Sequence, residues 1–346
     1  MSAPLPATIR WVGDLDGYLE VLDQTQLPRR VEVLRMDACE DVIAAIRRLS
    51  VRGAPAIGVA AAYGLVLGVR AAAPTQRAFE GVMTAVADEL RAARPTAVNL
   101  AWALERCARA CASSPSLATL FHEAVSIHAD DAATTRSIGV NGASLVPESG
   151  TVLTHCNTGR LATAGDGTAL SVLFAAWGQG RRFRVLAGET RPLLQGARLT
   201  ALELSREGIP VEVLADGAGP GLIQRGDVHM VIVGADRIAK NGDIANKVGT
   251  YPLALACAAA GVPFYCAAPL STFDAAIDTG AEIPIEERSM SEVTALGGMP
   301  ITPDGVGARN PAFDVTPHHL ITGIVTDAGV FTPPFEAQIA QAQSPR

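Results

Sequence analysis

The fold is decided by the stretch Val231-Ile-Val-Gly-Ala-Asp-Arg-Ile-Ala-Lys-Asn-Gly-Asp-Ile-Ala-Asn-Lys247. The apolar run 230–233 predicts a buried strand, because short apolar runs are typical of strands covered on both faces. Two small residues follow, and Asp236 then stands at the carboxyl end of this strand. Ligands of parallel α/β sheets bind outside these ends. Asp236 is therefore a candidate site residue; the alternatives are a helix cap or an ion pair with Arg237.

Three further segments have the same pattern, in which an apolar or β-branched run is followed by polar residues. They are 151–159, with His155, Cys156 and Asn157; 183–192, with Glu189, Thr190 and Arg191; and 262–274, with Ser271, Thr272 and Asp274. Helical patterns at 162–177, 193–207 and 251–260 separate the strands. The repetition predicts an α/β, Rossmann-like fold with a parallel sheet covered by helices on both faces. We therefore expect the four polar turns to meet in one crevice.

The chain of 346 residues is long for a single core, and its pattern changes near residue 130. Residues 1–130 predict a mainly helical N-terminal domain with a small antiparallel sheet. Its strands are expected at 9–12 and 30–35, and its helices at 38–49, 55–69, 76–93 and 100–112. A further helical segment, 117–145, is expected to lead into the second domain. Residues 131–346 predict the Rossmann-like parallel α/β domain with the polar turns.

The composition, with 49% hydrophobic residues, is typical of a soluble globular enzyme. The formal net charge is −7 and no basic stripe is present, which argues against nucleic acid or an anionic membrane as partner. No signal peptide is evident, and the uncharged stretch 251–270 is broken by Gly261-Val-Pro263, so we expect a cytoplasmic protein. The six cysteines form no CxxC pair, and the carboxylates form no recognisable metal set; we expect no metal.

An anion site is indicated by Arg52-Gly-Ala-Pro-Ala-Ile-Gly58, which precedes an apolar helix. Glycine lets the backbone approach a ligand, proline suits a first helical turn, and a helix N-terminus beside an arginine attracts anions. The alternative is an ordinary Gly/Pro helix start. In an acidic chain the cations for a phosphate must be gathered locally, which makes Arg52, Arg94 and Lys247 candidates.

Several motifs in the same order carry a resemblance to a known family. They are Arg52–Gly58, Thr154-His-Cys-Asn157, Glu189-Thr-Arg-Pro192 with Gln195-Gly-Ala-Arg198, Gly234–Ile238, Asn246–Tyr251, Ile283–Arg288 and Asn310–Pro317. From about Ile9 to about Val330 the chain resembles the S-methyl-5-thioribose-1-phosphate isomerases, which are grouped with the regulatory subunits of translation initiation factor 2B. Small departures are Gly188 where an acid is frequent, Arg160 where a small residue is usual, and Asp327 where Glu is usual.

The resemblance implies an aldose–ketose isomerase of methionine salvage that converts 5-methylthioribose 1-phosphate to 5-methylthioribulose 1-phosphate. It implies Cys156 and Asp236 as catalytic residues. It implies substrate contacts from Arg52, Gly53, Ala54, Arg94, Gln195, Asn246 and Lys247. It also implies a sugar-phosphate substrate, no cofactor, and a homodimer built mainly from the parallel-sheet half.

The chemistry leaves two mechanisms open. Phosphate on the anomeric oxygen prevents ordinary ring opening, so an acid must protonate the ring oxygen, and burial can keep Asp236 protonated for this. Cys156 then transfers the C2 proton through a phosphoenolate, or a hydride shifts directly from C2 to C1. The roles of Cys156 and Asp236 can also be exchanged. Competing functions are isomerisation of 5-deoxyribose 1-phosphate or ribose 1,5-bisphosphate, and a non-catalytic regulatory subunit. His155 is expected to be held by a backbone carbonyl.

Overall fold

The computed structural model describes residues 4–72, 75 and 77–343. The chain divides into two compact units. Unit 1 comprises Met1–Arg136 and Thr158–Gly167, and unit 2 comprises Ser137–Asn157 and Thr168–Arg346. We call the segment Thr158–Gly167 the strap. A single boundary near residue 130, as expected from the sequence, does not account for the strap, which joins unit 1 from within the second half of the chain.

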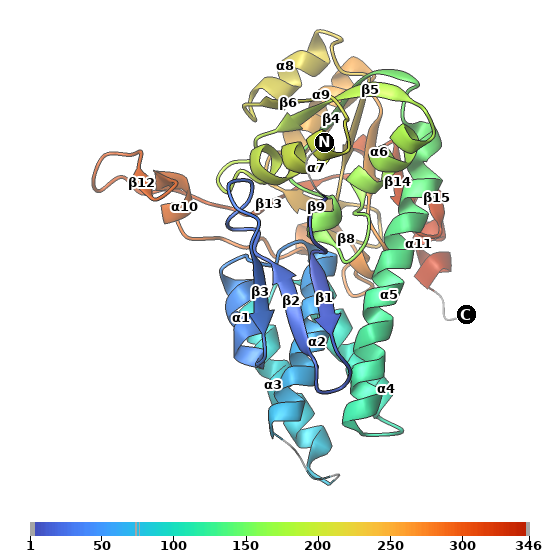
Figure 1. Ribbon diagram of the computed structural model, residues 1–346. Coiled ribbons are helices and arrows are strands. Elements are labelled where there is room, and N and C mark those ends of the chain that lie inside the picture. The colour runs from blue at the N-terminus through green and yellow to red at the C-terminus, as the bar shows by residue number, and fades with distance from the viewer. Residues whose placement is uncertain (1–3, 73–74, 76, 344–346) are drawn as a thin grey trace. The chain divides into compact units, whose positions relative to one another are not determined.

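Unit 1 contains a three-stranded antiparallel sheet at its N-terminal end (Figure 1). Its strands are β1 (Ile9–Val12), β2 (Tyr18–Leu22) and β3 (Val33–Met36), paired in chain order. The sequence predicted strands near β1 and β3, but not β2. Leu19 and Val21 of β2 are fully buried, so this strand contributes one face to the core of the unit.

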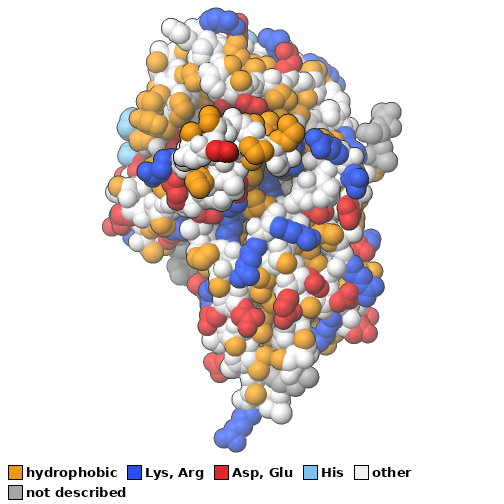
Figure 2. Space-filling model, turned by 90° about the vertical axis from the view of Figure 1, so that its left-hand side faces the viewer, with side chains coloured by type: hydrophobic (Ala, Val, Ile, Leu, Met, Phe, Trp, Pro, Cys, Tyr) orange, Lys and Arg blue, Asp and Glu red, His pale blue; other side chains and the backbone are white. Residues whose placement is uncertain are grey.

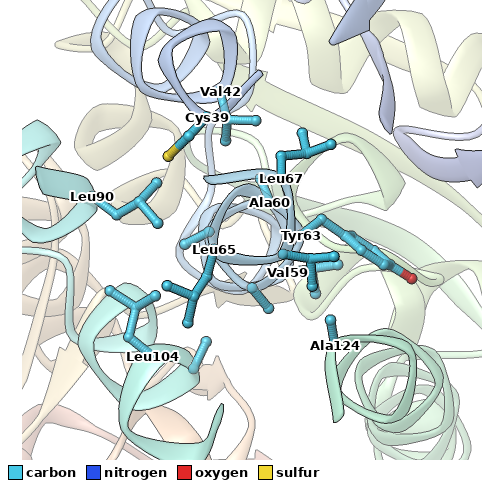
Figure 3. Packing of buried hydrophobic residues seen from close by; sticks show 14 of the residues in the cluster. Cys39, Val42, Val59, Ala60, Tyr63, Leu65, Leu67, Leu90, Leu104 and Ala124 are labelled. Carbon is cyan, nitrogen blue, oxygen red and sulfur yellow. The ribbon is translucent and has the colours of Figure 1, made fainter. Parts of the chain in front are cut away.

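The helices of unit 1 are assembled around one buried helix. They are α1 (Cys39–Arg47), α2 (Ala54–Ala72), α3 (Phe79–Ala93), α4 (Val98–Cys111) and α5 (Leu117–Gly142), whose last turns continue into unit 2. Gln76, where the sequence predicted the third helix to begin, lies outside the described residues. Side chains of α1, α3, α4 and α5 surround α2 (Figure 3).

Helix α2 has the composition of a membrane span but the burial of a core helix. By length and hydropathy it is the one such candidate among the described helices, and 72% of its most apolar window is buried inside the protein. Its small residues permit close packing: a Cβ on Gly58 would lie 2.7 Å from the carbonyl oxygen of Asn99 on α4. The all-round burial that the sequence predicted for residues 55–69 is confirmed.

Unit 2 is built on a seven-stranded sheet with the order β15-β14-β10-β7-β4-β5-β6. The strands are β4 (Ser149–Thr154), β5 (Arg182–Gly188), β6 (Val211–Leu214), β7 (Met230–Val233), β10 (Phe264–Ala267), β14 (Gly323–Thr326) and β15 (Gly329–Phe331). All neighbours are parallel except β14 and β15. The chain adds β5 and β6 on one side of β4, and then β7, β10 and β14 on the other. The point where this order reverses lies between β4 and β7, which is where doubly wound sheets bind ligands.

The remaining elements of unit 2 cover this sheet or extend from it. They are α6 (Ala169–Gly178), α7 (Ala201–Arg206), α8 (Ala218–Gln224), α9 (Thr250–Ala260), α11 (Glu336–Gln343), an antiparallel sheet of β8 (Arg237–Ile238), β9 (Ile244–Lys247) and β13 (Phe313–Thr316), and a hairpin of β11 (Ala295–Leu296) and β12 (Met299–Pro300) after α10 (Ser291–Thr294). Single 3-10 turns of unit 2 occur at Ala143–Leu145, Leu270–Thr272, Gly280–Glu282 and His318–Leu320, and the strap of unit 1 contains another at Arg160–Ala162. The hairpin projects away from the other elements of unit 2 (Figure 1).

Two helix predictions in this half were wrong at their N-terminal ends. The helix expected from residue 162 begins at Ala169, because the strap precedes it and Gly167 has a left-handed backbone with φ of 95°. The helix expected over 193–207 begins with a π-helical turn, Gly196–Thr200, before α7. By contrast, the stretch 251–270 forms α9, a turn and β10, as the sequence predicted.

Charged side chains of both signs are interspersed on the face of the molecule drawn in Figure 2. The chain has 28 Lys and Arg residues and 35 Asp and Glu residues, so its formal net charge is −7. No single-sign stripe of the kind that follows a nucleic-acid backbone runs over this face.

Candidate active site

Cys156 and Asp236 follow the carboxyl ends of two adjacent strands. Strand β4 ends at Thr154 and β7 ends at Val233, and the two strands pair in parallel. Both residues therefore stand at the point where the strand order of unit 2 reverses. The polar turns after β5 and β10 follow the strands on either side, so the four strands that the sequence predicted to end in polar residues are neighbours in the sheet.

Asp236 is half-buried at the end of a wholly buried strand. Its backbone N–H donates to the carbonyl oxygen of Ala245 on β9 over 2.9 Å. Its neighbour Arg237 forms an ion pair with Asp274, with 3.1 Å between Nη1 and Oδ2. Arg237 thereby links the turn after β7 to the turn after β10.

Cys156 has a backbone that non-glycine residues seldom adopt, with φ of 63°. Its N–H donates to Thr190 Oγ1 over 2.9 Å, and its carbonyl oxygen accepts from Thr200 Oγ1 over 2.6 Å. Backbone strain of this kind concentrates at functional sites. The thiol is also the most accessible in the chain, since Cys156 is half-exposed and the other five cysteines are buried.

His155 is a buried residue between the strand ends of unit 2. Its Nε2 lies 2.8 Å from the carbonyl oxygen of Val248, so the expectation that a backbone carbonyl holds this ring is confirmed. Burial lowers the pKa of His155, and because a carbonyl only accepts, the proton resides on Nε2. The ring lies between two glycines: a Cβ would stand 2.7 Å from it at Gly188 and 3.0 Å at Gly249.

The three predicted substrate contacts of unit 2 are all buried. Asn246 Nδ2 donates to Thr250 Oγ1 over 2.9 Å. Lys247 is 8% exposed, donates to the carbonyl oxygen of Ala312 over 2.9 Å and lies over the Phe313 ring. Lys247 is therefore no ordinary surface charge.

Gln195 precedes the π-helical turn and is 5% exposed. Its Oε1 atom is buried and has no hydrogen-bond partner among the described residues. A buried amide oxygen without a donor is costly, which is expected where a ligand supplies the donor.

Two carboxylates that the sequence analysis did not single out organise the neighbouring turns. Asp216 accepts the backbone N–H groups of Thr190 and Arg191 over 2.8 and 2.7 Å. Asp314 accepts those of Gly249 and Tyr251 at the N-terminus of α9, and burial raises its pKa to about 6. Asp314 lies within the motif Asn310–Pro317, which was the available signal; Asp216 had none.

The other predicted substrate contacts belong to unit 1. Arg52 is 7% exposed, Gly53 has φ of 93°, and Ala54 begins α2. A Cβ on Gly53 would lie 2.4 Å from the carbonyl oxygen of Ala162 in the strap. Only glycine fits this contact, so Gly53 allows the strap, which begins two residues after Cys156, to pack against the start of α2.

Arg94 stands at the C-terminal cap of α3 and is half-buried. It lines a cavity of about 290 Å³ together with Pro95, Ala97 and Leu100. Arg94 is therefore not a plain surface charge. Across residues 4–72, 75 and 77–343, no group of three or more His, Cys, Asp or Glu side chains could hold a metal ion.

The model of the Initiation factor 2 subunit family matches residues 50–333. The chain belongs to the Initiation factor 2 subunit family. This family member is 52% identical to a methylthioribose-1-phosphate isomerase of Pelotomaculum thermopropionicum, with 96% of the chain and 93% of that relative covered. It is 48% identical to a 5-deoxyribose 1-phosphate isomerase of Moorella thermoacetica, with 97% of each covered.

Among solved structures, this member of the Initiation factor 2 subunit family is similar to a 5-methylthioribose 1-phosphate isomerase from Pyrococcus horikoshii. The TM-score is 0.88 at 41% identity, and the match covers 98% of this chain and 97% of that one. The similarity extends over both units, so the α/β fold is that of the family.

Proposed function

We propose that this chain is an aldose–ketose isomerase that converts 5-methylthioribose 1-phosphate to 5-methylthioribulose 1-phosphate in methionine salvage. The observation that carries the proposal is the position of Cys156 and Asp236 after two adjacent parallel strands, at the reversal of strand order. The names of full-length relatives at about half identity support the substrate. A purely regulatory subunit has no need of a thiol and a carboxylate at that point.

Cys156 and Asp236 are proposed as the catalytic pair. The acid, Asp236 in this assignment, protonates the ring oxygen as its bond to C1 breaks. Hydrogen then moves from C2 to C1, either as a proton through Cys156 or as a hydride. The C2 hydroxyl gives its proton to Cys156 or to the carboxylate that the first step leaves on Asp236, and a ketone forms. Neither scheme needs a metal or a cofactor. Asp236 is assigned the acid role because it directly follows the carboxyl end of the buried strand β7.

The proposed substrate contacts come from two places in the chain. Arg52, Gly53, Ala54 and Arg94 are offered by unit 1, and Gln195, Asn246 and Lys247 by unit 2. The helix start at Ala54 and the arginine before it suit the phosphate. The unpartnered oxygen of Gln195 suits a sugar hydroxyl, which can donate to it.

The test is turnover of 5-methylthioribose 1-phosphate by the purified chain, with ketone formation followed by NMR. Catalysis that is lost in Cys156→Ala supports the proposal, and the absence of any ketone with the native chain contradicts it. A second candidate substrate, 5-deoxyribose 1-phosphate, is favoured by the relative from Moorella thermoacetica. The ratio of kcat/KM for the two sugars decides between them.

A homodimer formed mainly by the second domain, residues 131–346, is proposed as the assembly, in the cytoplasm. Exposed apolar side chains in unit 2, such as Val213, Tyr251 and Leu255, support this assignment. Light scattering at micromolar concentration tests it, and a monomeric mass contradicts it.

A further inference from the structure

The backbone of Cys156 is held from both sides by threonine hydroxyls. Thr190 Oγ1 accepts the N–H of Cys156 and itself donates to the carbonyl oxygen of Gly188 over 3.0 Å. Thr200 Oγ1 donates to the carbonyl oxygen of Cys156 over 2.6 Å. Both backbone polar groups of the cysteine are thereby fixed while its φ stays at 63°.

A buried carboxylate stands behind the Thr200 side of this arrangement. Asn157, the residue after the cysteine, donates from Nδ2 to Glu203 Oε1 over 2.7 Å and to Thr200 Oγ1 over 3.3 Å. Glu203 lies on α7 and is only 3% exposed. Hydrogen bonds therefore fix both the carbonyl oxygen of Cys156 and the side chain of Asn157.

The Thr190 side has its own support. The N–H of Thr190 donates to Asp216 Oδ1, which fixes a second left-handed residue, with φ of 67° at Thr190. Two non-glycine residues in the left-handed region therefore lie next to each other in space, joined by the bond from Cys156 to Thr190. Such conformations persist only where the surroundings over-determine them.

We propose that Thr200 and Glu203 are positioning residues that hold Cys156 in its left-handed conformation and so aim its thiol. Glu203 does not exchange a proton with substrate; it acts through Asn157 and Thr200. Without the hydrogen bonds from Thr200 to Cys156 and from Asn157 to Glu203, the backbone of Cys156 relaxes to the extended region, which moves its Cβ and sulfur atoms. A shift of about 1 Å at a reacting group can lower the rate by about 10²-fold. The catalytic consequence rests on the proposed function, whereas the position of the thiol does not.

The experiment compares Thr200→Val, which keeps the shape but lacks the hydroxyl, with Thr200→Ser, which retains a donor. Thr326→Val is the matched control, because Thr326 is a buried threonine, like Thr200, and its hydroxyl hydrogen-bonds only within the turn to Ala328 and Gly329 at the end of β14. Two quantities are measured: kcat and KM with methylthioribose 1-phosphate, and the rate of alkylation by iodoacetamide with the adducts located by mass spectrometry.

In Thr200→Val we expect kcat to fall by about tenfold or more, with KM changed by less than about threefold. Cys156 should be alkylated about threefold faster or more, because the released turn opens the half-exposed thiol to solvent. Thr200→Ser should restore most of both quantities, and Thr326→Val should change neither. General unfolding is distinguished by adducts on the five buried cysteines.

Unchanged alkylation and unchanged kcat in Thr200→Val overturn the proposal. If the native chain does not turn over the sugar, the proposed function fails, while the alkylation rates still decide the positioning role. Should Thr200→Val not fold, Glu203→Gln and Glu203→Leu replace it. The amide oxygen of glutamine can accept from Asn157, so native-like alkylation is expected only for Glu203→Gln; equal behaviour of the two overturns the role of Glu203.

Discussion

Gly188 lies so close to His155 that a Cβ on Gly188 would stand 2.7 Å from His155 Nδ1 and 3.1 Å from Asp216 Oδ1. A side chain at position 188 must therefore displace a ring that is hydrogen-bonded to Val248. We expect Gly188→Ala to lower the free energy of unfolding by about 1–3 kcal/mol, as overpacking does. Because His155 precedes Cys156, kcat should fall as well. Urea denaturation and steady-state kinetics measure the two effects.

Gly178→Ala is the matched control for this substitution. Gly178 ends α6, has no heavy atom within 4 Å of an added Cβ, and does not require a left-handed backbone. The free energy of unfolding should stay the same or rise slightly, because alanine favours the helix. Equal destabilisation by both substitutions would show that the contact with His155 is unimportant.

The catalytic pair is tested by Cys156→Ala and Asp236→Asn. Each should lower kcat by about 10²-fold or more, the usual loss on removing a positioned acid or base. Circular dichroism should show an unchanged fold, since Cys156 and Asp236 are only half-buried. Near-normal turnover in either variant removes that residue from the mechanism.

Phosphate recognition is tested by competition. Inorganic phosphate should raise the apparent KM without changing kcat, because it should compete for the anion site proposed at Arg52 and the start of α2. Arg52→Ala should weaken inhibition by phosphate about tenfold, which corresponds to ~1.4 kcal/mol. Arg52→Lys, which retains the charge, should lose less. Inhibition that is identical in the native chain and Arg52→Ala contradicts this assignment.

The strap should make stability depend on pH through Asp131. This carboxylate accepts the N–H of Ala164 in the strap over 2.6 Å, and burial raises its pKa from 3.8 to about 6. The folded state therefore binds more protons than the unfolded state between these values, and the contribution of Asp131 to stability falls as pH rises through that window. Above this pH window the ionised carboxylate of Asp131 lowers the free energy of unfolding by up to about 3 kcal/mol, compared with a protonated Asp131.

Asp131→Asn isolates this contribution, because its side-chain oxygen can still accept from Ala164 but does not ionise. We measure the free energy of unfolding of both chains by urea denaturation at pH 4 and at pH 7. The value for Asp131→Asn minus the value for the native chain should be larger at pH 7 than at pH 4. The same difference at both pH values would mean that Asp131 does not titrate in this window.

The strand ends were predictable because their signal is local. Short apolar runs that end in polar residues marked β4, β5, β7 and β10, and the same runs placed Cys156 and Asp236 at one edge of the sheet. The exposed edge strand β6 and the short antiparallel strands β8, β9 and β13 were missed, because they span only two to four residues and contain polar residues, which leaves too short a run to distinguish from a turn.

The strap and the hydrogen bonds that fix Cys156 were not predictable, because both depend on contacts between residues far apart in the sequence. The strap is held by Asp131 and Thr135 of α5, which accept the N–H groups of Ala164 and Asp166. Thr200 lies 44 residues from Cys156 in the sequence, and nothing in the pattern of α7 identifies Glu203 as a buried partner of Asn157. Because the prediction used local helix propensity alone, it began helix α6 at residue 162, inside the strap, instead of at Ala169.

The two mechanisms differ in the fate of the hydrogen on C2. A proton removed by Cys156 can exchange with water before it returns at C1, whereas a hydride stays on carbon throughout. We expect a hydride shift, because a thiol and a protonated carboxyl are poor bases for a carbon acid. The surroundings on the Asp236 side favour a dry site, since β7 is wholly buried and is followed by the small residues Gly234 and Ala235.

The measurement is conversion of C2-deuterated substrate in ordinary water, with C1 of the product examined by NMR. A hydride shift retains nearly all the deuterium at C1. A dry site slows exchange in either mechanism, so partial retention is compatible with both, and the decisive result is washout. Loss of most of the deuterium to solvent excludes the hydride shift as the main path and makes Cys156 the carbon base. In that event Cys156→Ser, whose hydroxyl is a far weaker acid than a thiol, should abolish both turnover and exchange, whereas under a hydride shift it should retain measurable turnover with full retention of label.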